Sequence, residues 1–451
     1  MRLQPYKLPP DATFKKTHVL RRCYVTATER MIEMRLPASY LIVILSWPLS
    51  PALAVSVEDF GAFGNATADA TDAIQAALDA GQGPVLLPAG RYRLTRTLRL
   101  PSGSGLYGHG TLYMDADETV LSNHGDDKGL NDVLIKGIQI EKRFVENSEK
   151  DGIFIEHATN LRIDCVSVTG ISACFGIALV RCENFSITNC YVHDFKASWT
   201  KRKLPGGRSL DAIGIMLNHC QWGQVTNNRI ENLNVTYESA VAVHYQTDGI
   251  NPRHSKQVTI ANNIIRNVGE GIDLVDCESM SLTGNIIQQC WHFGIKVIHG
   301  SRLCTISNNT IRDAALNGMS LYFGNPEFGP GYGNVVQGNT IVNTGSIAIT
   351  GEPDGAKQGV WEKWQTAGID LHNDSRANNS VYDYIIANNV IYNTPEHRTC
   401  QYGINERFHT YGNEREDKKQ PDTSLFTNKI SGNLIRGMQA GKYKTFSKTV
   451  D

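Results

Sequence analysis

Short runs of alternating apolar and polar residues recur along the chain in one form, Gly-φ-x-φ-x, where φ is apolar. Alternation with a period of two predicts strands rather than helices. The shortest steps between copies are 22 to 24 residues, and longer steps carry insertions. The copies begin at Gly152, Gly176, Gly214, Ala240, Gly271, Gly294, Gly318, Ser346 and Gly368, with a degenerate last copy at Gly403.

A second string keeps the same interval and consists of an Asn followed two residues later by Ile. Its copies begin at Asn228, Asn263, Asn285, Asn309, Asn339, Asn389 and Asn433. A unit of this size cannot bury its own apolar face, so successive units must stack into a solenoid with one continuous core. Equivalent residues then lie about 4.8 Å apart along the stack. The Asn positions are expected to pass side-chain hydrogen bonds from coil to coil.

The segment from Val57 to Leu78 resembles the N-terminal module of the pectate-lyase superfamily, and the strings 88–94 and 106–112 continue the resemblance. The resemblance implies an all-β fold, a single-stranded right-handed parallel β-helix, here of about 10–11 coils. Lyases, glycoside hydrolases, epimerases and phage tailspikes share this fold, so the resemblance leaves the activity open. From the residues alone, 72–80 is a short amphipathic helix that would cap the N-terminal end of the solenoid.

The first 54 residues are expected to lie outside the fold. An apolar run from Leu36 to Leu49 follows Arg35 and precedes Ala52-Leu-Ala54, which is the pattern of a secretory signal peptide. The expected start is Met31 or Met34, and a long N-terminal region or a membrane anchor is the alternative. We therefore expect a periplasmic or secreted protein without a membrane span in its mature form.

The domain organisation expected from these patterns is one β-helix domain over residues 55–451. Within it, 55–115 form the N-terminal cap module and 393–451 an irregular C-terminal part. The net charge of −1 offers no basic field for nucleic acid or an anionic membrane. The sequence is compatible with a monomer or with a homo-oligomer such as a trimer.

Nine of the ten cysteines follow the expected cleavage site. Cys165 and Cys190 are assigned to the Asn position of their coils, and Cys182, Cys220 and Cys277 share another offset. Stacking of small apolar side chains is the favoured interpretation, and disulfides between coils are the alternative in an oxidising compartment. No CxxC or zinc-type spacing occurs, so no metal site and no cofactor are expected.

In each repeat the two x positions point outward and form two columns along the stack. The first column is expected to hold Phe154, Ala178, Met216, Ala242, Asp273, Lys296, Ser320, Ala348, Asp370 and Asn405. The second is expected to hold Glu156, Val180, Asn218, His244, Val275, Ile298, Tyr322, Thr350 and His372. The columns become polar and ionisable between His244 and His372, which predicts a functional groove there.

The candidate catalytic residues lie in or directly after these strands: Asp273, Lys296, His244, Asp276, His299 and Tyr322. Asp273 and Lys296 are expected on neighbouring coils, as are Asp276 and His299. Insertions 245–256, 322–334 and 351–367 would wall the groove. Candidate substrate-binding residues are Tyr245, Arg253, Trp361, Trp364, Asp370 and His372, because aromatic faces stack on sugars and Arg pairs with carboxylates.

The expected function is cleavage of glycosidic bonds in an acidic polysaccharide, by elimination or by hydrolysis. A lyase needs a base and a cation beside a uronate carboxylate, whereas a hydrolase needs two carboxylic acids. The paired Asp-Asp of polygalacturonases is absent, and Gly294-Ile-Lys-Val matches their Arg-Ile-Lys only in part. Asp370-Leu-His-Asn-Asp374 is similar to the Asp-Pro-His-Asp of alginate epimerases. Uronate epimerisation and a non-catalytic glycan-binding solenoid therefore remain alternatives.

Two further expectations concern the pair Asp273 and Lys296. Calcium is an alternative without a clear site, because Asp273 and Asp276 alone offer too few ligands. Lys296→Ala and Asp273→Asn are expected to abolish activity with little change in melting temperature. A cross-strand ion pair worth about 0–1 kcal/mol is the competing, purely structural interpretation.

Overall fold

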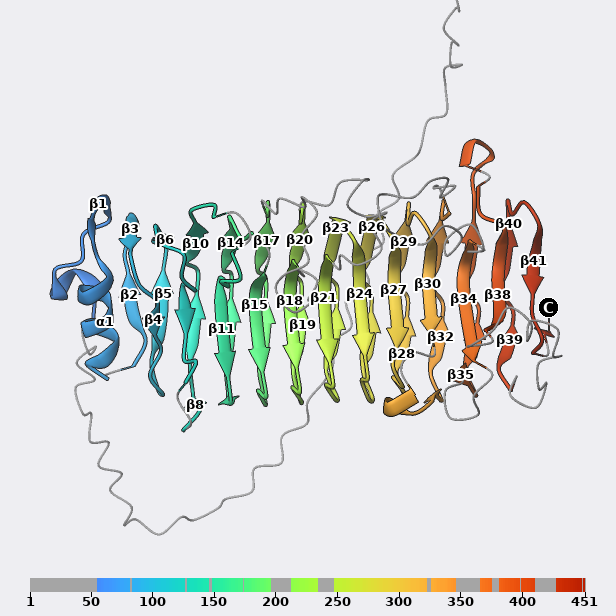
Figure 1. The fold of residues 1–451 in the computed structure, drawn as a ribbon, viewed down its shortest axis with the longest axis horizontal. Coiled ribbons are helices and arrows are strands. Elements are labelled where there is room, and N and C mark those ends of the chain that lie inside the picture. Colours follow the sequence, from blue (N-terminus) through green and yellow to red (C-terminus); the bar gives the residue numbers. More distant parts are fainter. Residues whose placement is uncertain are drawn as a thin grey trace, which may run out of the picture. The chain divides into compact units, whose positions relative to one another are not determined.

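A computed structural model shows the arrangement of strands along the chain (Figure 1). The structure describes residues 55–81, 83–125, 128–145, 148–172, 174–195, 212–233, 247–322, 326–345, 366–374, 381–397, 399–409, 427–447 and 449–450. Residues 1–54, including the expected signal peptide, lie outside these ranges.

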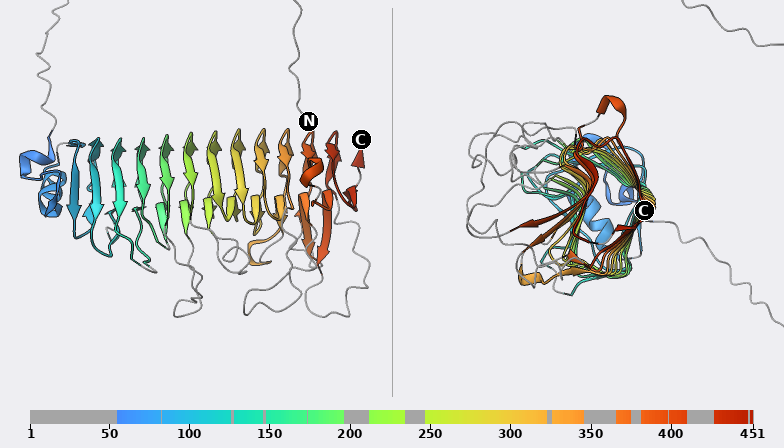
Figure 2. Two further views of the ribbon diagram at one scale, coloured as in Figure 1. Left: turned by 90° about the horizontal axis from the view of Figure 1, so that it is seen from above. Right: turned by 90° about the vertical axis from the view of Figure 1, so that its right-hand side faces the viewer.

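Three long parallel sheets wrap around one core, and each coil contributes one strand to each sheet (Figures 1 and 2). Sheet 1 contains β2 (Val85–Leu87), β5 (Gly105–Gly108), β9 (Leu134–Lys136), β13 (Arg162–Asp164), β16 (Ser186–Thr188), β19 (Gln224–Thr226), β22 (Thr259–Ala261), β25 (Ser281–Thr283), β28 (Thr305–Ser307), β32 (Val335–Gln337), β36 (Ile385–Ala387), β39 (Lys429–Ser431) and β42 (Thr449–Val450). Sheet 2 contains β1 (Asn65–Asp69), β3 (Arg91–Leu94), β6 (Thr111–Met114), β10 (Gln139–Lys142), β14 (Ser167–Thr169), β17 (Tyr191–His193), β20 (Arg229–Glu231), β23 (Ile264–Val268), β26 (Ile286–Cys290), β29 (Thr310–Arg312), β33 (Thr340–Val342), β37 (Val390–Tyr392) and β40 (Leu434–Arg436). Sheet 3 contains β4 (Leu98–Arg99), β7 (Leu121–Ser122), β11 (Ile153–Glu156), β15 (Phe175–Val180), β18 (Ile213–Asn218), β21 (Asp248–Arg253), β24 (Glu270–Val275), β27 (Phe293–Ile298), β30 (Asn317–Tyr322), β34 (Ala367–Asp374), β38 (Tyr402–His409) and β41 (Gly441–Lys444).

The remaining described elements are short and lie outside the three sheets. Two pairs of strands are β8 (Leu130–Asn131) with β12 (Ala158–Thr159), and β31 (Gly331–Tyr332) with β35 (Val381–Tyr382). The 3-10 helices are η1 (Val57–Phe60), η2 (Pro326–Phe328) and η3 (Pro395–His397).

The chain folds as a right-handed parallel β-helix, as the repeats and the resemblance predicted. The described part contributes 12 strands to sheet 3 and 13 to each of sheets 1 and 2, which exceeds the expected 10–11 coils. The difference arises because residues 55–115, expected to form the N-terminal cap module of the β-helix domain, themselves contain coil strands, from β1 to β6. The sheets also continue through β38 to β42.

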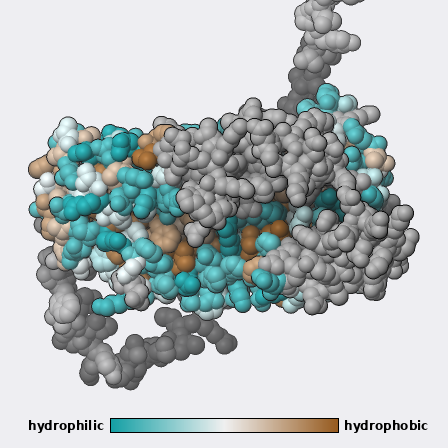
Figure 3. All heavy atoms as spheres, in the orientation of Figure 1, coloured by the Kyte–Doolittle hydropathy of each residue, from teal (hydrophilic) through white to brown (hydrophobic). Residues whose placement is uncertain are grey.

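The core consists of the inward-facing apolar residues of all three sheets, in the alternation that the repeats predicted. Outward positions are largely polar, and hydrophilic residues predominate on the coloured part of the face in Figure 3. At the corner between sheets 1 and 2, the Asn side chains form the expected ladder. Asn263 Nδ2 donates to Asn285 Oδ1 over 2.9 Å, and Asn285 Nδ2 donates to Asn309 Oδ1 over 2.9 Å.

The N-terminal end of the coils carries α1 (Thr71–Asp79), within one residue of the predicted helix (Figure 1). Its buried residues include Ile74, Ala77 and Leu78, the face predicted to be apolar. The helix lies against η1 and β4 and covers apolar strand edges that would otherwise meet water.

The cysteines from Cys165 to Cys400 are all free thiols in the described part of the chain. Cys190 occupies the ladder position, because its backbone N–H donates to Asn228 Oδ1 over 2.9 Å. The assignment of Cys165 to that position is wrong. Cys165 is equivalent to Asn189, the residue before Cys190, and both have a φ of 56°. Within the described ranges, no helix is long and apolar enough to cross a bilayer.

Candidate functional site

The outward column in the middle of sheet 3 is the feature that organises the candidate site. Asp273 pairs in register with Lys296, Lys296 with Ser320, and Ser320 with Asp370. Asn405 follows Asp370 on the next coil. The predicted order of these polar residues is therefore confirmed from Asp273 to Asn405.

The coil before Asp273 differs from the prediction. Its sheet-3 strand is β21, which pairs with β18 on one side and with β24 on the other. Asn251, not Ala242, therefore precedes Asp273 in the first column, and Arg253 takes the position expected for His244 in the second. Ala240–Val243 had matched the repeat by chance and lie outside the described residues.

The copy expected at Ser346 does not lie between β30 and β34 in sheet 3, because these two strands pair directly, and residues 346–350 lie outside the described residues. Four predicted site residues, His244, Tyr245, Trp361 and Trp364, lie outside the described residues.

A cluster of three carboxylates around one ammonium occupies β21, β24 and β27. We call Asp248, Asn251, Glu270, Asp273 and Lys296 the acid–lysine cluster. Lys296 Nζ lies 3.0 Å from Glu270 Oε2 and 3.2 Å from Asp273 Oδ2. Asn251 Nδ2 donates to Asp248 Oδ2 over 2.8 Å and to Asp273 Oδ2 over 3.2 Å.

The acid–lysine cluster is buried, which was not expected from the sequence. Asp248 and Asp273 have 0% of their surface exposed, and Lys296 has 7%. The cross-strand ion pair of Asp273 and Lys296 is therefore present, but it is buried, so a contribution of about 0–1 kcal/mol, which holds for surface pairs, does not apply to it. Among the described residues, Asp248 Oδ1 and Asp273 Oδ1 have no hydrogen-bond partner, which leaves two buried acceptor atoms in the cluster.

Burial and shared charge separate the pKa values of the cluster. Burial opposes ionisation of Glu270, but Lys296 and His292 outweigh it and lower the pKa of Glu270 to about 2. Burial raises the pKa of Asp273 to about 6 although Lys296 is in contact with it. Burial, followed by the charges of Glu270 and Asp273, raises the pKa of Asp248. Burial disfavours the Lys296 ammonium, but the surrounding carboxylates more than compensate and raise its pKa.

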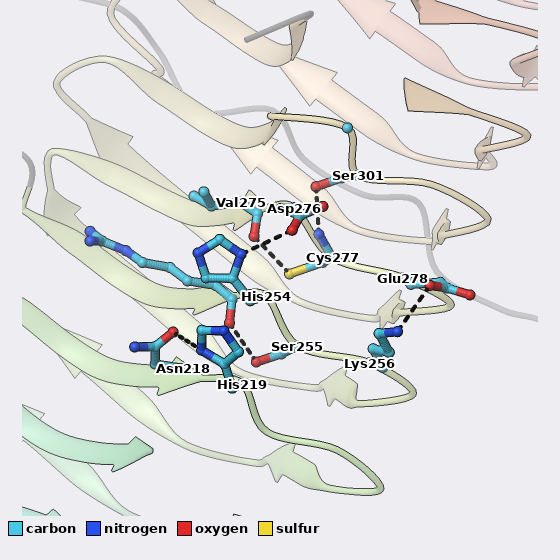
Figure 4. A network of polar contacts seen from close by, with 12 residues as sticks. Asn218, His219, His254, Ser255, Lys256, Val275, Asp276, Cys277, Glu278 and Ser301 are labelled. Atoms are coloured by element: carbon cyan, nitrogen blue, oxygen red, sulfur yellow. Dashed lines mark hydrogen bonds and ion pairs between the residues drawn. The ribbon is translucent and has the colours of Figure 1, made fainter. Parts of the chain in front are cut away.

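Ionisable side chains, among them His219, His254 and Asp276, follow directly on the strands of sheet 3 (Figure 4). The rings of His219 and His254 lie 4.6 Å apart between centroids. His254 Nδ1 lies 2.9 Å from Asp276 Oδ2, and Arg302 Nη1 lies 3.4 Å from Asp276 Oδ1. Burial and the positive charge of Lys296 lower the pKa of His299 to about 4, so its imidazole is neutral at pH 7.

A second polar group lies further along sheet 3, on β30, β34 and β38. Asp370 is fully buried, accepts from Arg407 Nε over 2.9 Å and also contacts Arg407 Nη2. Asn405 Nδ2 donates to Asp370 Oδ1 over 2.9 Å. The rings of Tyr322 and His372 meet edge to face with centroids 4.5 Å apart. Asp370 and His372, predicted to bind substrate, thus lie with Tyr322 and Arg407.

Asp248, Asn251 and Arg407 lie in these polar groups although the sequence did not predict them there. The strongest missed signal is an acid directly before the glycine of a repeat, as in Asp248-Gly249 and Glu270-Gly271. These two acids are paired in register on neighbouring coils.

Comparison with known proteins identifies the family of the chain. The description "Rhamnogalacturonase A/epimerase, pectate lyase-like" matches residues 54–296, more than half of the chain. The chain belongs to this family. A right-handed β-helix region matches residues 213–413. The rhamnogalacturonase A/epimerase match spans the whole acid–lysine cluster and ends at Lys296, whereas Asp370 and its partners lie only in the second match.

At the level of individual proteins, sequence identity to this family member is low. A pre-neck appendage protein of Bacillus phage B103 is 23% identical over 298 residues, covering 65% of this chain and 29% of the relative. The chain thus spans less than a third of the length of that relative.

Two solved structures show the same fold. The A-module of the mannuronan C-5 epimerase AlgE6 of Azotobacter vinelandii is 16% identical, with a TM-score of 0.56 over 88% of this chain and 98% of that one. The family 28 exopolygalacturonase of Yersinia enterocolitica is 13% identical, with a TM-score of 0.52 over 88% of this chain and 79% of that one.

Proposed function

We propose that the chain is an exported enzyme that hydrolyses glycosidic bonds in an acidic polysaccharide at the acid–lysine cluster. The observation that carries the proposal is a pair of buried carboxyl groups, Glu270 and Asp273, that share the Lys296 ammonium at 3.0 and 3.2 Å and whose pKa values are shifted in opposite directions. Asp273 has a pKa of about 6, and Glu270 has a pKa of about 2. Hydrolysis of a glycosidic bond needs one protonated carboxylic acid and one carboxylate, which is this combination.

In the proposed reaction, the Asp273 carboxylic acid donates its proton to the glycosidic oxygen as the bond to the anomeric carbon breaks. Water attacks the anomeric carbon and forms the new C–O bond. The Glu270 carboxylate stabilises the positive charge that develops on the sugar ring and accepts a proton from this water, so that one water is added across the broken bond. Lys296 holds both carboxylates in place and remains an ammonium. Its raised pKa argues against the elimination alternative with Lys296 as the base.

The half-buried residues Arg253, His254, Asp276 and His299 adjoin the cluster and would contact the sugar chain. Arg253 offers a guanidinium, which pairs well with a uronate carboxylate. No metal is needed in this proposal, because the Lys296 ammonium supplies the cation between the carboxylates.

A second candidate is C5 epimerisation of a uronate, or elimination, at Tyr322 and His372. Both reactions begin with removal of the C5 proton, for which a phenol and an imidazole 4.5 Å apart are suitable groups. Arg407 and Asp370 lie beside them, and a guanidinium can neutralise the uronate carboxylate.

One set of incubations separates these proposals and the non-catalytic alternative. The mature protein is incubated with polygalacturonate, alginate and rhamnogalacturonan, and three products are measured. New reducing ends without absorbance of unsaturated uronates support hydrolysis, and that absorbance supports elimination. A changed ratio of uronate epimers in the NMR spectrum, without chain shortening, supports epimerisation. None of these products would support a binding protein.

The two sites are distinguished with conservative variants. Asp273→Asn should abolish hydrolysis, whereas Tyr322→Phe and His372→Asn should leave the chemical step intact if the acid–lysine cluster is the catalytic site. The reverse result would move the activity to Tyr322 and His372.

A further inference from the structure

A serine, a histidine and an aspartate form a chain of hydrogen bonds on sheet 2, whereas the acid–lysine cluster lies on sheet 3. Ser167 is the first residue of β14, and His193 is the last residue of β17 on the next coil. Ser167 Oγ lies 3.2 Å from His193 Nε2, and His193 Nδ1 lies 2.8 Å from Asp194 Oδ2. These are the two contacts by which a base activates a serine nucleophile and an acid orients the base.

The aspartate determines which imidazole nitrogen of His193 carries the proton. An ionised carboxylate only accepts hydrogen bonds, so the proton of the neutral ring lies on Nδ1, which faces Asp194. Nε2 then has a free lone pair and accepts the O–H of Ser167. A hydroxyl that donates to an imidazole loses its proton to that ring when the oxygen attacks an electrophile.

Neighbouring side chains hold the base and the acid in place. The ring of Tyr191 stacks on the ring of His193, with centroids 3.7 Å apart and an angle of 14° between the planes. Tyr191 Oη donates to Glu231 Oε1 over 2.5 Å, which fixes the stacked ring. Asn232 Nδ2 donates to Asp194 Oδ1 over 2.9 Å and leaves Oδ2 for the histidine. Support of this kind keeps catalytic groups in a productive geometry.

The surroundings of Ser167 suit a small substrate. Ser167 and His193 are half-buried, and Asp194 is exposed, so the hydroxyl is accessible from solvent. Gln139 pairs in register with Ser167 from the preceding coil, at a strand spacing of about 4.8 Å, and is exposed. Its Oε1 accepts from Thr111 Oγ1 over 3.4 Å. The amide N–H groups of Gln139 are donors of the kind that stabilise an oxyanion.

We propose that Ser167, His193 and Asp194 form a second active site, which hydrolyses carboxylic esters with a short acyl group, such as acetyl esters of sugar hydroxyls. The outward neighbours of Ser167 in the adjacent coils, Gln139 and Tyr191, are polar or amphipathic, which favours a short acyl group over a long apolar one. This activity is independent of the proposed cleavage of glycosidic bonds.

In the first half of the reaction, Ser167 Oγ attacks the carbonyl carbon of the ester, and its proton passes to His193 Nε2. The bond from that carbon to the alcohol oxygen then breaks, and the alcohol leaves with the proton from His193. The product is an acyl ester of Ser167. In the second half, water attacks this ester by the same route, so the carboxylic acid leaves and the serine is restored. One water is consumed for each ester, and Asp194 acts as a positioning residue.

The test uses the full chain and two readouts. Hydrolysis of p-nitrophenyl acetate measures turnover, and a fluorophosphonate probe followed by peptide mass spectrometry detects covalent reaction at Ser167. Ser167→Ala removes the nucleophile, and His193→Gln removes the base. The matched control is Ser186→Ala, because Ser186 is a half-buried strand serine of β16 in sheet 1. Thermal unfolding followed by circular dichroism establishes that each variant is folded.

We expect Ser167→Ala and His193→Gln to lower kcat at least about hundredfold and to abolish labelling, whereas Ser186→Ala should behave like the unmodified chain. Asp194→Asn should lower kcat about tenfold or more with KM unchanged, because a carboxamide allows the other tautomer of His193. Turnover by folded Ser167→Ala equal to that of the unmodified chain would overturn the second active site. Absence of both turnover and labelling in the unmodified chain would also overturn it. Neither readout depends on cleavage of a glycosidic bond, so the proposed function is tested separately.

Discussion

Removal of the Lys296 ammonium tests whether the acid–lysine cluster is a buried charge system. Lys296→Ala leaves Asp248, Glu270 and Asp273 buried without the cation that contacts two of them at 3.0 and 3.2 Å. Removing one partner of a buried ion pair costs about 3–5 kcal/mol, because an uncompensated charge stays in the interior. The expectation of a nearly unchanged melting temperature assumed an exposed pair, and burial reverses it. Lys256→Ala is the matched control, because Lys256 pairs with Glu278 at 3.5 Å on the surface and its loss should cost less than about 1 kcal/mol.

The penalty for Lys296→Ala should also depend on pH. Without Lys296, burial and mutual repulsion keep the folded-state pKa values of the three carboxyls above their unfolded values near 4. The folded variant then binds more protons than the unfolded chain, so stability present at low pH is lost as the pH rises through the folded-state pKa values. Urea unfolding followed by circular dichroism at about pH 5 and about pH 7.5 measures this. Equal midpoints for the variant and the unmodified protein at both pH values would refute the buried charge system.

Three other predictions follow from the same contacts. Cleavage should decline as the pH rises above about 6, where Asp273 loses the proton that it donates, and a rate that increases from pH 6 to 8 would contradict that role. Asn285→Ala should destabilise the protein by about 1–3 kcal/mol in urea unfolding, because the backbone and side-chain N–H groups of Asn263 lose their acceptor. The control, Asn308→Gly at an exposed left-handed corner, should change the free energy of unfolding by less than about 0.5 kcal/mol. Activity should be unchanged by EDTA, since the Lys296 ammonium supplies the cation, and stimulation by added calcium after chelation would contradict this.

The sequence predicted much of the fold because each coil repeats the same local physics. Period-two alternation identified the strands, and the spacing of 23 residues was enough to put Asp273 beside Lys296. The coil of Asn251 was missed because Pro252 takes an inward position in β21, where an apolar strand residue was sought. The alternation at Ala240–Val243 was therefore assigned, incorrectly, as the sheet-3 strand that precedes Asp273.

The sequence pattern did not predict the burial of the site residues. The alternation predicts that Asp273 and Lys296 point away from the core, but it does not predict whether water reaches them. The pKa values, and thus the choice of Asp273 as an acid, depend on that burial rather than on the residue types.

The two buried polar groups share an arrangement that affects how their variants must be interpreted. In each, the cation comes from the next coil toward the C-terminus: Lys296 follows Asp273, and Arg407 follows Asp370. Until that coil docks, the carboxylate lies on the open edge of the stack, and docking buries it together with its partner. The ion pair therefore couples the stability of neighbouring coils, in addition to any chemistry. Alanine at Asp273 or Asp370 would leave a buried cation unpaired and weaken the stack, so a loss of activity would be ambiguous. The amide substitution Asp273→Asn keeps the volume and one acceptor oxygen, and it is the variant that separates proton transfer from folding.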